Sequence, residues 1–197
     1  MNHFVVNGKE HDVSNLANQT VGQLLARINT DYTNVNSMVT SISIDGVVVD
    51  ASLEERFSQT PLESIQSVEV STSHPREFVE DTLQTLIKFS DRLIQISEGL
   101  AMQLENGVTD VSFERLIEGL EVFTDTLTCA KNLLGVGMIP KVQVLEADLA
   151  SILRDLTHAR EHAQLGFQVE LLRDHLIENL QEWKELGIPT LIRSRDS

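Results

Sequence analysis

After residue 75, apolar residues recur at steps of three and four, and this spacing constrains the fold more than any other feature of the chain. Such steps place apolar side chains on one face of an α-helix. Three stretches carry the pattern, over residues 75–105, 113–134 and 141–186. The spacing therefore predicts long helices that lie side by side at shallow crossing angles, as in an antiparallel bundle or a coiled coil.

Glycine and proline mark the predicted ends of these helices. Pro75 suits a first helical turn, where a proline loses no hydrogen bond, and Asn106-Gly107 is a left-handed C-cap signal. Gly135 and Pro140 end the second helix, and Gly187-Ile188-Pro189 ends the third. The chain is thus expected to leave each helix at a residue that a helix tolerates poorly.

The third stretch is longer than its partners, at about 65 Å against about 40 Å if it is one helix. Either it turns near Gln164-Leu165-Gly166-Phe167 to give an antiparallel four-helix bundle, or it is one bent helix that overhangs the others. We favour the bent helix, because neither a proline nor a polar turn cluster accompanies Gly166. A homodimer through the helical domain would then cover the overhang.

The first 72 residues have a different pattern, with two Gly-containing turns between short strand-like runs. Asn7-Gly8 and Asp45-Gly46 suit the tight turns of β-hairpins, since these residues tolerate positive φ angles. A helix lies between the hairpins, with Thr20 as its N-cap. The side chains expected on buried faces are Phe4, Val6, His11 and Val13 on the first hairpin and Val21, Leu24, Leu25 and Ile28 on the helix.

Two hairpins, a helix between them and a late fifth strand over residues 65–70 follow the order of the β-grasp fold. The segments that carry the likeness are Val6-Asn7-Gly8-Lys9, Asn18-Gln19-Thr20-Val21-Gly22-Gln23-Leu24-Leu25, Ile44-Asp45-Gly46-Val47-Val48-Val49 and Ile65-Gln66-Ser67-Val68-Glu69-Val70. Residues 1–72 resemble the ubiquitin and sulfur-carrier superfamily. That superfamily holds carriers activated at a C-terminal Gly-Gly and members that only bind other proteins. Here Ser71-Thr72-Ser73-His74 stands at the matching point, and the chain continues. The resemblance therefore implies protein binding rather than carrier chemistry.

We thus expect an α+β protein, with a ubiquitin-like ββαββ β-grasp domain at 1–73 and an all-α antiparallel bundle with a long last helix at 74–197. Fifteen Lys and Arg stand against thirty Asp and Glu, giving a formal charge of -15. Such a surface repels nucleic acids and anionic lipids. A single cysteine and the lack of a signal peptide or membrane span point to the cytoplasm.

His158-Ala159-Arg160-Glu161-His162 is the sharpest motif, since it fits the His-x-x-Glu-His pattern of inverted zinc peptidases. Histidines four apart on a helix can share a metal ion. The heptad places Glu161 at the outermost position, and no third ligand is identified, so a solvated helix face is the preferred interpretation. His158 and His162 remain candidates for a metal, and no catalytic or cofactor-binding residue is predicted.

The other residues with potentially reactive side chains are expected to have structural roles. Cys129 lies beside the seam of the second helix and is expected to fill the core, while His11 and His175 are expected to be structural. The acids on the first two helices have the spacing that is typical of a solvent-exposed helix face. They are Asp81, Asp91, Glu98 and Glu105 on the first helix and Glu114, Glu118, Glu121 and Asp125 on the second.

Together these features favour a non-enzymatic adaptor or scaffold protein that binds other proteins. The first alternative is an acidic helical chaperone or secretion-system accessory, in which charge keeps an open apolar groove in solution. The second is a metal-dependent hydrolase at the His-x-x-Glu-His motif. An open apolar groove would favour the chaperone, and bound metal the hydrolase.

Overall fold

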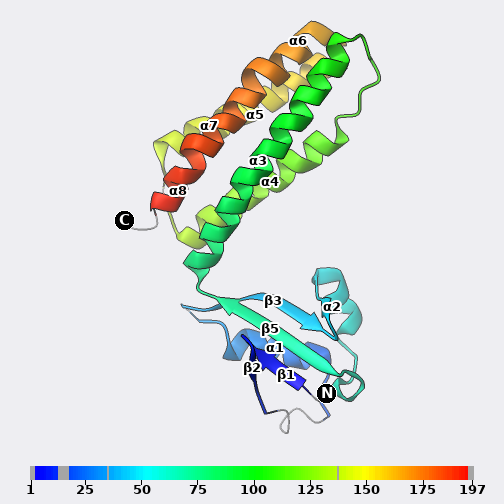
Figure 1. Ribbon diagram of the computed structural model, residues 1–197, viewed down its shortest axis with the longest axis vertical. Coiled ribbons are helices and arrows are strands. Elements are labelled where there is room, and N and C mark those ends of the chain that lie inside the picture. The colour runs from blue at the N-terminus through cyan, green and yellow to red at the C-terminus, as the bar shows by residue number, and fades with distance from the viewer. Residues whose placement is uncertain (1–2, 13–17, 35, 137, 195–197) are drawn as a thin grey trace. The chain divides into compact units, whose positions relative to one another are not determined.

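The computed structural model describes residues 3–12, 18–34, 36–136 and 138–194. It forms two compact units, Met1–Phe78 and Val79–Ser197 (Figure 1). The first unit contains a mixed β-sheet and the second is built from helices, so the protein is of the α+β class. Within the described ranges, no helix has the length and apolar character needed to cross a membrane.

The N-terminal unit is a five-stranded sheet with the strand order β2-β1-β5-β3-β4. Strands β1 and β5 are parallel, and the other neighbours are antiparallel. The strands are β1 (His3–Val6), β2 (Lys9–Glu10), β3 (Met38–Ile44), β4 (Val47–Val48) and β5 (Ser67–Ser73). The helical segments are α1 (Val21–Asp31), α2 (Ala51–Phe57) and the 3₁₀ segment η2 (Leu62–Ser64).

The turns and the helix cap of this unit are confirmed. Asn7 and Asp45 have φ angles of 51° and 50°, each followed by a glycine of positive φ. Thr20 forms a reciprocal capping box with Gln23 at the start of α1. The four α1 residues expected on the buried face form one core with Phe4 and other residues of the sheet.

Two features of this unit differ from the prediction. Helix α2 was not predicted, although Asp50 caps it by accepting a hydrogen bond from the Leu53 N–H at 2.9 Å. The placement of His11 in the core was wrong, because β2 ends at Glu10 and the strand alternation stops there. The exposed His11 ring contacts Tyr32, with 3.3 Å between Nδ1 and the hydroxyl oxygen. Val13 lies outside the described residues.

The helical unit contains four antiparallel helical stretches around one apolar core (Figure 1). The first three are α3 (Pro75–Glu105), α4 (Glu114–Leu134) and α5 (Pro140–Glu161). The fourth, residues 165–194, is called the C-terminal segment here. It comprises α6 (Leu165–Glu170), η3 (Leu171–Leu176), α7 (Ile177–Glu182), η4 (Trp183–Gly187) and α8 (Ile188–Ser194), of which η3 and η4 are π-helical.

The preference for one bent helix over residues 141–186 was wrong, because α5 ends in a tight turn. The N–H groups of Ala163 and Gln164 bond to the carbonyls of Arg160 and Ala159, at 3.1 and 2.9 Å. This pair of hydrogen bonds is a Schellman motif. In this motif the residue directly after the helix C-cap adopts the left-handed conformation. Here that residue is Ala163, with φ of 51°, where glycine is usual. The turn was missed because its usual glycine is absent.

The C-terminal segment therefore folds back along α5 instead of extending beyond its partners (Figure 1). Its inward residues Leu172, Leu176 and Leu180 are fully buried in the core of the same unit. The overhang on which the expected homodimer depended is therefore absent. A homodimer would have to use another surface.

Ala163→Gly should stabilise the protein by about 1 kcal/mol, because glycine adopts positive φ without the steric cost that alanine pays. Urea unfolding followed by circular dichroism measures the change. Ala150→Gly is the matched control: it lies on an exposed position within α5 and should destabilise by about 1 kcal/mol. Changes of the same sign at both positions would contradict the left-handed turn.

The expected helix break at Gly187-Ile188-Pro189 was also wrong. The Ile188 N–H bonds to the Trp183 carbonyl, five residues earlier, and the chain continues into α8. Pro189 is the second residue of α8, directly after this π-helical turn, and it has no N–H to donate to that turn. A π-helical turn thus carries the chain past residues that usually end a helix.

Candidate functional site

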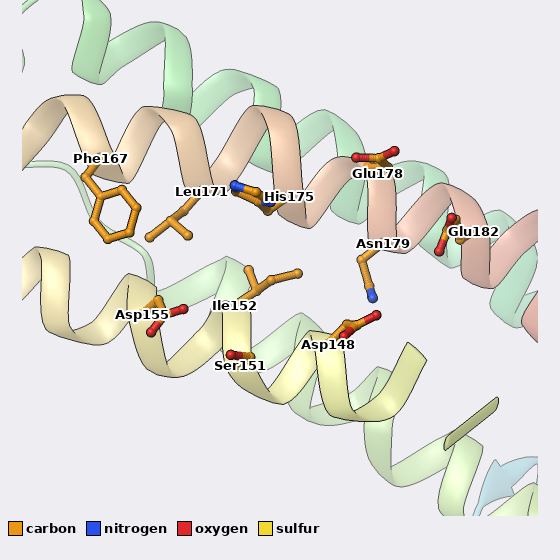
Figure 2. Close-up of a pocket in the computed structure, with 10 residues that line it drawn as sticks. All are labelled: Asp148, Ser151, Ile152, Asp155, Phe167, Leu171, His175, Glu178, Asn179 and Glu182. Carbon is orange, nitrogen blue, oxygen red and sulfur yellow. The ribbon is translucent and has the colours of Figure 1, made fainter. Parts of the chain in front are cut away.

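A groove of about 420 Å³ lies between α5 and the C-terminal segment. Figure 2 shows the side chains of the two helical stretches on either side of it. Both stretches supply residues at steps of three and four, so that one face of each helix lines the groove. The lining residues are Asp148, Ser151, Ile152 and Asp155 of α5 and Phe167, Leu171, His175, Glu178, Asn179 and Glu182 of the C-terminal segment.

The groove carries negative charge that the rest of the unit does not neutralise. Its four carboxylates are exposed, and none forms an ion pair with a described residue. Two cations of the C-terminal segment are paired with α3 instead. Lys184 Nζ lies 2.6 Å from Asp91 Oδ1, and an Arg173 amino group lies 2.9 Å from Glu105 Oε2. No lysine or arginine is among the described residues that line the groove.

Asn179 is the most unusual residue of the groove, because its side chain is only 5% exposed. Its amide nitrogen donates to the Leu145 carbonyl at 3.2 Å, which fixes the orientation of the amide. The remaining atom, Oδ1, has no hydrogen-bond partner in the described part of the chain. Four residues later, the buried Trp183 Nε1 also lacks one. Both atoms are inaccessible to solvent, so the polar groups that the groove presents to a ligand are its exposed side chains.

Apolar side chains lie at both ends of the groove. Phe167, which is 38% exposed, lies at the end near the α5 turn (Figure 2). At the other end, Glu182 also borders a neighbouring apolar hollow of about 340 Å³. The exposed side chains of Val144 and Leu186 line this hollow. The surface is therefore acidic in its middle and apolar at its two ends.

The spacing of the acids indicates what this surface can hold. Among the described residues, one group of three His, Cys, Asp or Glu side chains lies close enough together to share an ion, and it lies outside the groove. The groove carboxylates therefore do not gather around a single ion. Acids spread along a groove suit an extended cation, such as a segment with several lysines or arginines.

The cluster outside the groove is the predicted one at the end of α5. His158, Glu161 and His162 are exposed, and one ligand atom from each lies within 4.8 Å of the others. The two imidazole rings lie 4.1 Å apart between centroids. The motif therefore forms a compact group on the surface, with a glutamate on the solvent side as the heptad indicated.

The other candidates divide between core and surface. Cys129 is exposed, so its assignment to the core was wrong: only its neighbours Leu127 and Ala130 lie on the buried face. His175 is exposed in the groove rather than at a helix interface. The solvated face predicted for α4 is confirmed. Its four acids, Glu114, Glu118, Glu121 and Asp125, are all exposed.

The sequence reasoning missed the groove itself. The turn at Ala163 brings two faces of the third stretch together, which one continuous helix could not do. The sequence does contain a pattern that could have indicated the groove: polar residues recur at helical spacing on both sides of Ala163. They are Asp148, Ser151 and Asp155 before it and His175, Glu178 and Glu182 after it.

Comparison with known proteins gives one match. Residues 3–74 match the family model described as "TP0873 N-terminal domain". This range covers the described sheet and no part of α4, α5 or the C-terminal segment. No curated protein and no solved structure matches the chain. The N-terminal unit is thus similar to a described domain family.

Proposed function

We propose that this protein is a non-enzymatic adaptor whose helical unit binds a basic segment of a partner protein in the groove between α5 and the C-terminal segment. The observation that carries the proposal is the row of four exposed carboxylates along the groove, none of which forms an ion pair with a described residue. Lysine and arginine side chains suit these carboxylates, because they carry positive charge and donate several hydrogen bonds.

The apolar ends of the groove define the partner segment further. A segment with basic residues in its middle and apolar residues near both ends would match Phe167 at one end and Leu186 at the other. An amphipathic helix presents such residues at steps of three and four. The apolar contacts would supply most of the affinity, and the charges would supply orientation and association rate.

The N-terminal unit is proposed to be a β-grasp domain of the ubiquitin-like superfamily. Its strand order, with β1 parallel to β5 and α1 packed on the sheet, supports this assignment. The chain continues past β5 into α3, so a Gly-Gly end is lacking there. We propose that this domain is a second protein-binding surface of the adaptor.

Calorimetric titration with a synthetic peptide tests the groove. The probe is a 14-residue leucine–lysine peptide with lysines in its middle and leucines at both ends. Glu178→Gln together with Glu182→Gln should weaken binding about tenfold, because two charge-assisted contacts are removed. The measurement is the dissociation constant at about 150 mM salt, where nonspecific surface attraction is screened.

A double variant on another acidic face is the matched control. Glu118→Gln with Asp125→Gln makes the same change in net charge on exposed positions of α4. It should change the affinity less than twofold. Equal weakening by the two double variants would mean that the peptide responds to net charge only, and would refute the groove as a docking site.

A chaperone or secretion-accessory role is the second candidate, and one observation favours it. A mainly apolar hollow of about 220 Å³ opens between α4 and α5, lined by residues that include Ile117 and Leu153. Charge reversal in the acidic groove would leave client binding at this hollow intact. The hydrolase alternative has weaker support, because its three residues lie on an exposed helix end.

A further inference from the structure

His158, Glu161 and His162 form a second, separate site at the end of α5. We propose that it binds one divalent transition-metal ion of the Zn²⁺ class. The three residues occupy positions i, i+3 and i+4, which lie on one side of a helix. Their ligand atoms already lie within 4.8 Å of one another, so a single ion can reach all three. Two imidazoles and a carboxylate are ligands that zinc prefers.

The tautomer of His162 is set for metal binding. Its Nδ1 lies 2.9 Å from the carbonyl oxygen of His158. Because a carbonyl oxygen can only accept, Nδ1 must carry the proton, and the lone pair of the neutral ring is on Nε2. Histidines that bind metals commonly donate their other ring nitrogen to a backbone carbonyl in this way. His162 therefore offers Nε2 to an ion without changing its hydrogen bond.

The local electrostatics also favour a cation. The site lies in the last turn of α5, where the aligned peptide dipoles give the helix end a partial negative charge. The only cation of the motif, Arg160, is engaged elsewhere. Its guanidinium carbon lies 4.5 Å from the centre of the Phe113 ring. Its charge is therefore held by the start of α4, away from the two imidazoles.

Three protein ligands leave at least one position of a tetrahedral ion open, and solvent can fill it because all three residues are exposed. Glu161 would serve as a ligand, so it is not available as a base. His162 is also the C-cap of α5, next to Ala163. The ion would thus join the last helical turn to the cap and stabilise the turn from which the C-terminal segment begins.

The test uses the full chain, stripped of metal by a chelator, titrated with ZnCl₂ and with CoCl₂. We expect one Zn²⁺ per chain, a rise in melting temperature with Zn²⁺, and a visible Co²⁺ spectrum with histidine coordination. His162→Ala and Glu161→Gln should each weaken Zn²⁺ binding at least tenfold, as loss of one ligand does. Circular dichroism of the metal-free variants checks that each is folded, since the three side chains are exposed.

His175→Ala is the matched control, because it removes another exposed histidine from the same unit. It should leave the affinity within twofold. Zn²⁺ binding that survives the loss of His158 or His162, or the absence of any binding at 100 µM Zn²⁺, would overturn the site. The peptide affinity of the groove is independent of this result, because no groove residue belongs to the metal site.

Discussion

Trp183→Ala is expected to lower the free energy of unfolding by about 3–5 kcal/mol, the largest effect that we predict for a single substitution. The Trp183 side chain is fully buried in the core of the helical unit. Its ring meets the Phe123 ring edge-on, with 5.9 Å between centroids. The truncation removes these contacts and leaves a cavity, because packed helices relax only partially. Urea unfolding followed by far-UV circular dichroism, which reports the helical backbone, measures the loss.

Trp183→Phe separates packing from hydrogen bonding at this position. Phenylalanine keeps most of the apolar volume and removes the buried N–H, which has no hydrogen-bond partner in the described part of the chain. The loss of stability should therefore be less than half of that in the alanine variant. A phenylalanine variant as unstable as the alanine variant would contradict this account, since it would mean that the N–H contributes most of the stability.

Gly187→Ala is expected to destabilise the protein by about 1–3 kcal/mol, although alanine normally stabilises a helix. A Cβ at this position would lie 2.4 Å from Cε3 of Trp183 and 2.9 Å from Cδ1 of Leu145. The ring cannot move away, because it is enclosed by the core. The same unfolding measurement detects the change. Gly99→Ala is the matched control, since a Cβ on that helical glycine meets nothing within 4 Å.

The two positions should be coupled. In a Trp183→Ala background the ring that would collide is absent, so Gly187→Ala should become neutral or stabilising. A double-mutant cycle measures this as a coupling free energy of about 1–3 kcal/mol. Additive losses from the two substitutions would show that Gly187 is required for a reason other than the position of the Trp183 ring.

The sequence predicted the features that depend on local patterns. The hairpin turns at Asn7-Gly8 and Asp45-Gly46, the Thr20 cap and the buried faces of α3 and α4 were all predicted. Each of these features depends on a few adjacent residues or on helical spacing.

The missed features depend on contacts between residues that are distant in sequence or on an unusual choice of residue. The α5 turn uses Ala163 where glycine is usual, so its signal was absent from the sequence. Gly187 indicated a helix end, but the ring of Trp183 occupies the space beside it. Cys129 was placed in the core because it lies next to the apolar seam of α4. It is one residue before the buried Ala130, and this difference of one position on the helix leaves it exposed.

The candidate groove follows from the same missed turn. Because the chain reverses at Ala163, Asp148 and Asp155 face Glu178 and Glu182 across a groove rather than along one helix (Figure 2). The His158, Glu161 and His162 cluster, in contrast, lies within five residues and could be predicted from spacing alone. A site within one helix can therefore be predicted from the sequence more readily than a site between two helices.

The central claim is that a basic segment docks in the groove beside Asn179, and NMR shift mapping with the leucine–lysine peptide tests it most directly. The account predicts that the largest shifts occur at Ile152, Leu171 and the side-chain amide of Asn179, with small shifts on the acidic face of α4. Shifts spread evenly over the acidic surfaces, with the Asn179 amide unchanged, would contradict it.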